Sequence, residues 1–274
     1  MNIFLNKKKA FTLIELLSVI VIIALLTTMI LVNMSGVRGK AKRVKILEFS
    51  QTINSSIGDY AVGIWRFDEG SGNIAHDSSG YVNNGTIYGA SFATGTIGRA
   101  ISFNGSSYIS VGNNDVLNIG ADDDLTVEVW AKSNGFSSGG GIVSKGSWEN
   151  SGYFISYAYD SQCVFFVLRD AAGYTGKELN SGLCGVFDWS HVVGVKKGNN
   201  MEVWVNAKKV GELKNITFSS LSNGSNLSFG KSTNDYYFNG LIDEVRIYKQ
   251  ALNASQIQKS YAQGLRNKKM TSNL

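Results

Sequence analysis

The feature that constrains this chain most is an uncharged apolar run near its start. From Leu16 to Val37 the sequence holds no charged residue, and most side chains are Leu, Ile or Val. At 1.5 Å per residue a helix of this length spans about 33 Å, which matches the hydrocarbon core of a bilayer. The run is too long for the apolar core of a signal peptide, and no small-residue cleavage site closes it. We therefore expect one transmembrane helix, over about residues 13–37.

The charges around this run bear on its orientation and its role. The basic cluster Lys7–Lys9 places the N-terminus in the cytoplasm, whereas the cluster Arg38–Lys45 argues weakly for the opposite orientation. Glu15 lies at the edge of the run, where an unpartnered carboxylate costs several kcal/mol. Its carboxylate therefore either extends to the lipid headgroups or pairs with another group.

The stretch "KKKAFTLIELLSVIVIIALL" resembles the N-terminus of type IV prepilins and type II secretion pseudopilins. The resemblance implies that a prepilin peptidase removes residues 1–10 by cutting between Ala10 and Phe11, and that Phe11 is then N-methylated. Glu15 becomes the fifth mature residue and pairs with the N-terminal amine of a neighbouring subunit. Ala10 departs from the Gly that is usual before the cut. The resemblance also implies a pilin-like helix over residues 11–61.

Residues 62–262 have the pattern of short strands separated by turns of Gly, Asn, Asp and Ser. The whole chain has 31 Gly and no Pro, and its 43% hydrophobic and 17% charged residues indicate an ordered protein. Many segments alternate apolar and polar residues; in "LTVEVWAK", Val127, Val129 and Ala131 should face the core, and Glu128 and Trp130 the other side. This pattern predicts a mainly β protein, a jelly-roll β-sandwich. Residues 263–274 are expected to form a basic, disordered tail.

A second resemblance covers about residues 64–262. The stretches "WRFDEGSGNIAHDSSGYVNNGTIYG", "GRAISFNGSSYISV", "WSHVVGVKKGNNMEVWVNAKKVG" and "FNGLIDEVRIYKQALNASQIQKSY" resemble the laminin G-like, concanavalin A-like lectin/glucanase domain. Asn206-Ala207 stands where Asn-Gly is usual, so we expect a wider or less favourable turn. Asn253 is the expected N-cap of a short closing helix.

The net charge of +5 is unevenly distributed along the chain. Residues 60–262 hold 15 Lys or Arg and 18 Asp or Glu, so the large domain is mildly acidic. No basic face interleaved with aromatic residues is evident there, and nucleic acid is not an expected partner.

The carboxylates do not form a catalytic pattern. Retaining glycoside hydrolysis needs two carboxyl groups about 5 Å apart. Asp68-Glu69 and Asp243-Glu244 are adjacent pairs, and adjacent side chains of a strand point to opposite faces. We therefore expect no enzymatic activity.

Three polar residues are candidates for a structural calcium site. Calcium binds carboxylate, amide and carbonyl oxygens. Asp77 and Asn84 lie in "HDSSGYVNNG", and Asp243 lies in the last expected strand, which often pairs with the first in such sandwiches. The alternative is a turn held by Asx hydrogen bonds plus a salt bridge to Arg246.

Aromatic residues in loop-like stretches are candidates for a ligand site. Trp148, Tyr236 and Tyr237 could stack on a glycan or meet a partner, or they could be partly buried loop anchors. The two cysteines, Cys163 and Cys184, either form a disulfide in an exported domain or remain two buried thiols.

Together the two resemblances imply a pilin-like or pseudopilin subunit. It would sit in the inner membrane with its N-terminus in the cytoplasm and display a lectin-like domain outside, for filament assembly and adhesion or glycan recognition. Its partners would be other pilin-like subunits, the prepilin peptidase, the membrane and a glycan or surface protein. Three alternatives stay open: a minor pseudopilin of a secretion or DNA-uptake system that binds a protein, a surface lectin that does not polymerise, and a glycoside hydrolase.

Overall fold

The computed structural model describes most of the large domain and a short piece of the N-terminal segment. The described residues are 13–14, 16–18, 20–22, 60–135, 140–146, 151–157, 161, 163–170, 176–232 and 235–271, with the backbone alone for 267–271. The chain divides into two units, Met1–Ser56 and Ile57–Leu274, and each is described by itself. The predictions for Ala10, Phe11, Glu15 and Trp148 lie outside the described residues.

The described residues of the first unit are all helical. Their apolar side chains are exposed, from 51% at Val21 to 83% at Leu13. Within the described parts of the chain, no helix is both long and apolar enough to cross a membrane. Of the remaining residues of the helix expected over 11–61, only Tyr60 and Ala61 are described. Tyr60 lies in a turn and Ala61 begins the first strand, so the prediction that the helix reaches residue 61 is wrong.

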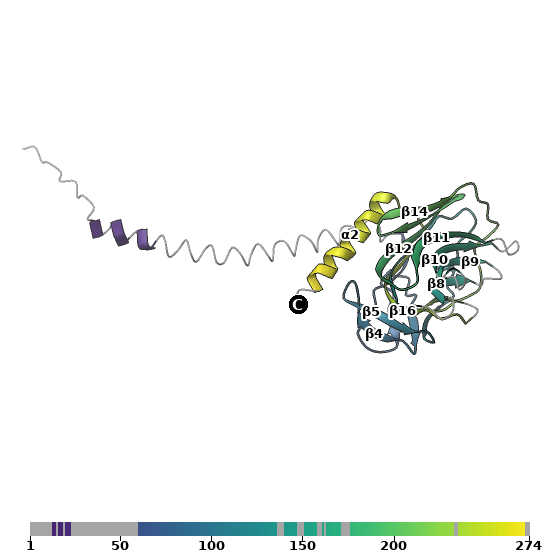
Figure 1. The fold of residues 1–274 in the computed structure, drawn as a ribbon, viewed down its shortest axis with the longest axis horizontal. Coiled ribbons are helices and arrows are strands. Elements are labelled where there is room, and N and C mark those ends of the chain that lie inside the picture. Colours follow the sequence, from purple (N-terminus) through teal and green to yellow (C-terminus); the bar gives the residue numbers. More distant parts are fainter. Residues whose placement is uncertain are drawn as a thin grey trace, which may run out of the picture. The chain divides into compact units, whose positions relative to one another are not determined.

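The second unit is a sandwich of two antiparallel sheets, each of eight strands among the described residues (Figure 1). The first sheet has the order β14 (Lys208–Leu213), β13 (Asn200–Val205), β12 (Phe187–Lys197), β7 (Leu125–Ser133), β16 (Asn239–Tyr248), β5 (Arg99–Asn104) and β4 (Ser91–Thr94), and β1 (Ala61–Trp65) also pairs with β16. The second sheet has the order β11 (Lys177–Cys184), β10 (Cys163–Arg169), β9 (Gly152–Tyr157), β8 (Gly140–Gly146), β15 (Leu227–Phe229), β6 (Tyr108–Gly112), β3 (Gly85–Tyr88) and β2 (Ile74–Ala75). The predicted mainly β sandwich is confirmed.

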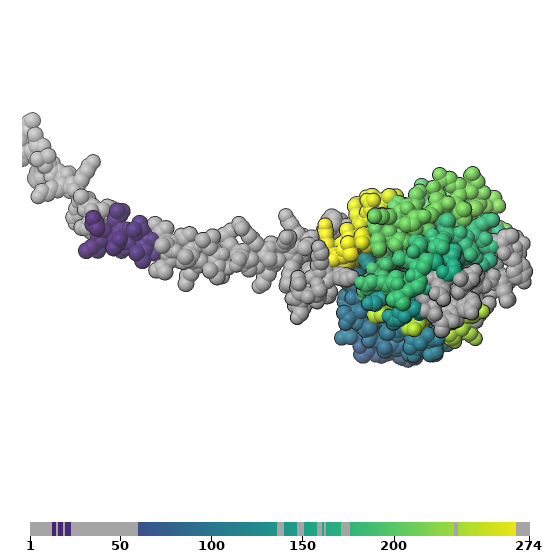
Figure 2. Space-filling view, viewed as in Figure 1, coloured from purple at the N-terminus to yellow at the C-terminus, as the bar shows by residue number. Residues whose placement is uncertain are grey.

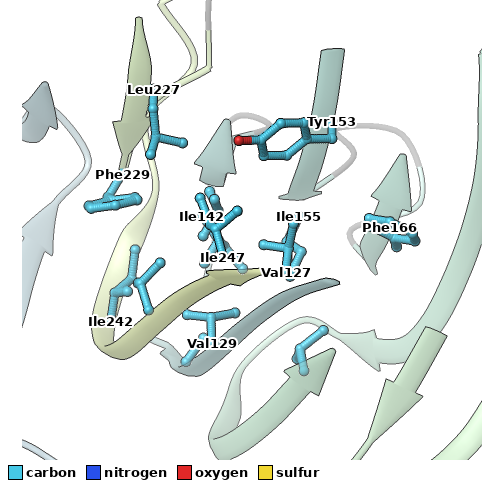
Figure 3. Packing of buried hydrophobic residues seen from close by; sticks show 14 of the residues in the cluster. Val127, Val129, Ile142, Tyr153, Ile155, Phe166, Leu227, Phe229, Ile242 and Ile247 are labelled. Carbon is cyan, nitrogen blue, oxygen red and sulfur yellow. The ribbon is translucent and has the colours of Figure 1, made fainter. Parts of the chain in front are cut away.

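The core lies between the inner faces of the two sheets. Val127 and Val129 of β7 are fully buried there, as the alternation of the strand predicts. Figure 3 shows them facing side chains of the second sheet, including Ile155 of β9 and Phe229 of β15. The buried apolar area of both sheets is the main stabilising term of the domain.

The outer face of β7 carries a buried charged network. Glu128 accepts hydrogen bonds from His191, 2.8 Å away, and from Ser260 of the C-terminal helix, and Arg246 approaches it to 3.4 Å. Burial raises the pKa of Glu128, but the Arg246 guanidinium and these hydrogen bonds outweigh burial and lower the pKa to about 2. The network joins β7, β12, β16 and the helix.

The closing helix, α2 (Ala254–Thr271), packs on this outer face (Figure 2, yellow). Asn253 Oδ1 accepts from Gln256 N at 3.0 Å, and Gln256 Oε1 accepts from Asn253 N at 2.8 Å, so the predicted N-cap forms a reciprocal capping box. Gly264 allows close approach, since a Cβ there would lie 2.5 Å from the Trp130 ring. The helix continues to Thr271, so the disordered tail expected from residue 263 is wrong for residues 263–271; Gly264, past that point, is still packed against Trp130.

Two local predictions also have an outcome. Asn206 and Ala207 form a two-residue turn between β13 and β14 with φ of 50° and 62°. Of the two expected alternatives, the turn is therefore the less favourable one and not the wider one. Cys163 and Cys184 lie opposite each other on β10 and β11 and form a disulfide.

Candidate ligand-binding site

Three serines form a row across the outer face of the second sheet. Ser228 of β15 pairs with Ser110 of β6 on one side and with Ser144 of β8 on the other. Leu227 and Phe229, which flank Ser228, point into the core. Because side chains alternate along a strand, the three serines share the opposite face.

This row forms the floor of a cavity of about 280 Å³. Its lining consists of Tyr108, Ser110, Ser144, Ser225, Asn226, Ser228, Lys231 and Ser232. Ser144 is 2% exposed, and its hydroxyl has no hydrogen-bond partner among the described residues. An unpaired buried hydroxyl costs free energy, so a ligand that bonds to it would recover that cost.

A short hairpin forms one wall of the cavity. Lys231 and Tyr237 are bridge partners, and the Lys231 Nζ lies 2.6 Å from the Asp235 carboxylate. The hydrogen bond that Lys231 donates to the Asp235 carboxylate raises the pKa of Lys231, so its ammonium is charged at neutral pH. Nζ also lies 4.8 Å from the ring centroid of Tyr108, which in turn stacks on Tyr88 at 4.8 Å.

A buried lysine, Lys145, holds the loop that contributes Ser225 and Asn226 to the cavity lining. The Nζ of Lys145 donates to the Ser225 carbonyl at 2.8 Å, to Asn118 Oδ1 at 2.9 Å and to Asn113 Oδ1 at 3.1 Å. Two oxygens of Asn223 complete its surroundings. Burial lowers the pKa of Lys145 to about 8, so it remains charged at pH 7. Lys145 thereby positions Ser225 at the cavity.

Two of the three predicted ligand residues, Tyr236 and Tyr237, lie beside this cavity, and Trp148 is outside the described residues. Tyr237 contacts the Tyr108 ring at 6.2 Å, and Tyr236 is 46% exposed on the same hairpin. Neither tyrosine is among the lining residues. Sequence reasoning placed the site in aromatic loops and missed the strand serines. Their signal was a polar residue between apolar neighbours, as in "LSF" around Ser228.

Of the predicted calcium ligands, Asp77 and Asn84 are joined by a hydrogen bond, whereas Asp243 accepts hydrogen bonds from a different segment of the chain. Asp77 accepts from the backbone N–H groups of Ile64, Ser79 and Asn83 and from the Ser79 hydroxyl, while Asn84 accepts from Asp77 N. Both carboxylate oxygens of Asp77 thus already accept hydrogen bonds, from its own turn and from Ile64 of β1. This part of the arrangement fits the Asx-turn alternative and leaves little room for a cation.

Asp243 fits a cation better. Its Oδ2 accepts from Thr96 N at 2.9 Å and Ile97 N at 3.0 Å, but its Oδ1 and the Thr96 hydroxyl are buried without a partner among the described residues. Burial, followed by the neighbouring Glu244, raises the pKa of Asp243 to about 8. Within the described residues no three His, Cys, Asp or Glu side chains gather as a metal site. Calcium at Asp243 therefore stays a prediction.

Sequence comparisons match both parts of the chain to known families. Residues 103–258 match the family described as the concanavalin A-like lectin/glucanases superfamily, and residues 5–31 match the prokaryotic N-terminal methylation motif. A search of curated proteins found no match.

Several solved structures share the fold. The binding domain of Paraclostridial Mosquitocidal Protein 1 is 17% identical, with a TM-score of 0.63, over 75% of this chain and 52% of that one. The binding domain of botulinum neurotoxin DC in complex with SialylT is 18% identical, with a TM-score of 0.59, over 76% and 52%. Domain 4 of AbnA, a GH43 arabinanase from Geobacillus stearothermophilus in complex with arabinotriose, is 22% identical, with a TM-score of 0.56, over 73% and 97%. The chain thus spans about half the length of the two toxin binding domains.

Proposed function

This chain belongs to the concanavalin A-like lectin/glucanase superfamily, and on that basis we propose that it is a pilin-like or pseudopilin subunit that displays a glycan-binding domain outside the cell. The N-terminal helix anchors the subunit in the membrane and then in a filament. The sandwich recognises a saccharide and so serves adhesion or surface recognition.

The observation that carries the glycan-binding half is the serine-floored cavity. A saccharide presents many hydroxyl groups that both donate and accept hydrogen bonds, and the five serines and one amide of the lining can meet them in either sense. The unpaired Ser144 hydroxyl supports a ligand that bonds at the floor. Two related folds solved with saccharides, the arabinanase domain and the neurotoxin domain, lend support by analogy.

The observation that supports the filament half is the exposed apolar helix. Leu13, Ile14, Leu16 and Leu17 are 55% to 83% exposed, and a surface this apolar needs lipid or neighbouring subunits to cover it. The match over residues 5–31 points to a processed and methylated N-terminus. Lipid would cover this surface while the subunit is in the bilayer, and neighbouring copies of the chain would cover it once the subunit has entered a filament.

A glycan array tests the binding function. The full chain is probed in a non-glycoside detergent, so that the detergent does not compete for the cavity. Ser228→Phe fills the floor of the cavity and should abolish binding, while Ser228→Ala removes one hydroxyl and should weaken it by several-fold at most. Wild-type protein that binds no glycan would refute the function and favour a protein partner. Release of reducing ends would instead indicate a hydrolase.

A further inference from the structure

We infer that the cavity takes the acidic group of an anionic saccharide, with the ammonium of Lys231 as its counter-ion. This inference rests on the proposed glycan-binding function and names the class of glycan. Among the described residues that line the cavity, none is a carboxylate and Lys231 is the one charged side chain. Every other polar side chain of the lining can donate a hydrogen bond. Such a lining suits a ligand group that accepts hydrogen bonds and donates none, as an ionised carboxylate or sulfate does.

The present partner of Lys231 is easily replaced. Asp235 lies four residues along the chain, outside the cavity lining, and its side chain is 72% exposed. Exposed ion pairs of this kind contribute little to stability. A ligand carboxylate could therefore take over the ammonium at little cost, and Asp235 would return to water.

The floor adds a charge-assisted hydrogen bond. The Ser144 hydroxyl is buried, has no hydrogen-bond partner in the described part of the chain, and borders the same cavity as Lys231. Hydrogen bonds to an ionised acceptor are roughly twice as strong as neutral ones. The buried ammonium of Lys145, bonded to the lining residue Ser225, adds positive charge nearby, and Asp115 is the acid that interacts with it.

The aromatic wall argues against a purely neutral ligand inside the cavity. Neutral sugars gain affinity by stacking on an open ring face, yet the Tyr108 ring is already stacked on Tyr88 and lies under the Lys231 ammonium. Tyr88 itself is 47% exposed and could hold the sugar ring next to the cavity. The acidic substituent would then enter the cavity, and the ring would rest on Tyr88.

The test compares acidic glycans with their neutralised forms. The full chain in a non-glycoside detergent is titrated with carboxylated and sulfated oligosaccharides, including oligogalacturonate, and with the same sugars after methyl esterification or desulfation. We expect at least one acidic probe to bind, and to bind about tenfold more weakly once neutralised. Lys231→Gln should cause a similar loss, Lys231→Arg should retain binding, and Asp235→Asn should tighten it. Affinity should also fall with added NaCl.

Each outcome decides the point. Equal binding of an acid and its neutral form, or wild-type affinity in Lys231→Gln, would overturn the inference and leave the proposed function intact. Binding of neutral glycans alone would do the same. Absence of binding to every acidic and neutral glycan would overturn the proposed function and the inference with it. Thermal unfolding of each variant shows that a loss of binding is not a loss of fold.

Discussion

Ala207 occupies a backbone conformation that an L-residue with a Cβ adopts at a cost. With φ of 62° it is the second residue of the β13–β14 turn, a position that favours glycine. The neighbouring Asn206, at φ of 50°, tolerates this region and accepts a hydrogen bond from His191 N at 2.9 Å. The turn is thus held in a tight geometry by Asn206, with Ala207 under strain.

Ala207→Gly should therefore stabilise the domain by about 1 kcal/mol, because relief of the left-handed strain exceeds the added flexibility of the unfolded chain. Urea unfolding followed by tryptophan fluorescence measures the change. Asn206→Gly is the matched control and should gain nothing, because it also removes the bond to His191. A less stable Ala207→Gly would show that the turn is not strained.

Asp243 provides the test of calcium. Its folded pKa of about 8 lies above the ordinary 3.8, so without a cation the folded state holds a proton that the unfolded chain releases. Stability should then fall as the pH rises from about 4 to about 8, and Asp243→Asn should remove this fall. Calcium at pH 8 should raise the melting temperature of the wild type and leave Asp243→Asn unchanged. A wild type indifferent to calcium would refute the site.

At the scale of elements, the charged network under α2 acts as a clamp between helix and sheet. Glu128 is 1% exposed and bonds to His191 of β12 and Ser260 of α2, with Arg246 of β16 beside it. Removal of one charged side chain from a buried ionic network leaves its partners buried without an opposite charge, which destabilises the folded state. The attachment of α2 thus depends on the Glu128 charge as well as on packing.

Glu128→Gln should destabilise the domain by about 3 kcal/mol at pH 7. The folded pKa of about 2 lies below the ordinary 4.5, so the stabilisation is present above pH 4.5 and is lost as the pH falls towards 2. The difference in the free energy of unfolding between Glu128→Gln and the wild type should therefore decrease as the pH falls from 4.5 to about 2. Glu178→Gln, at an exposed ion pair, is the control and should change stability by less than about 0.5 kcal/mol. If Glu128→Gln were still about 3 kcal/mol less stable than the wild type at about pH 2, the loss would come from packing and not from the Glu128 charge.

Strands with clear alternation could be predicted from the sequence, and others could not. The inward-facing Val127 and Val129 of β7 follow directly from their spacing. β8 and β15 lack such a signal, because "GGIVSKG" begins with two glycines and a bulge, and "LSF" is only three residues long. The cavity was missed, since Ser144 and Ser228 become neighbours only through non-local pairing.

At the scale of the whole molecule, the chain joins a pilin-like N-terminal motif to a lectin-like sandwich. The motif covers residues 5–31, and the strands begin at Ala61. The motif could be found because its residues are contiguous in the sequence. The cavity of the sandwich could not be found from the sequence, because its lining comes from segments far apart in the chain.

Glu15→Ala should leave membrane insertion intact and impair assembly by the loss of the pairing with a neighbour's N-terminal amine. Glu15→Asp keeps the charge and should assemble partially. Membrane fractionation measures insertion, and the yield of sheared surface filaments measures assembly. Normal filaments from Glu15→Ala would show that the carboxylate has no such partner.

The most direct test of the central claim examines both halves of the molecule at once. Cell-surface material from a prokaryote expressing the chain is sheared off and passed over immobilised glycans that the array has identified, and the N-terminus of the retained protein is read by mass spectrometry. The account predicts retained chains that begin with N-methylated Phe11. Retained chains that still begin at Met1, or no retention of the surface material at all, would contradict it.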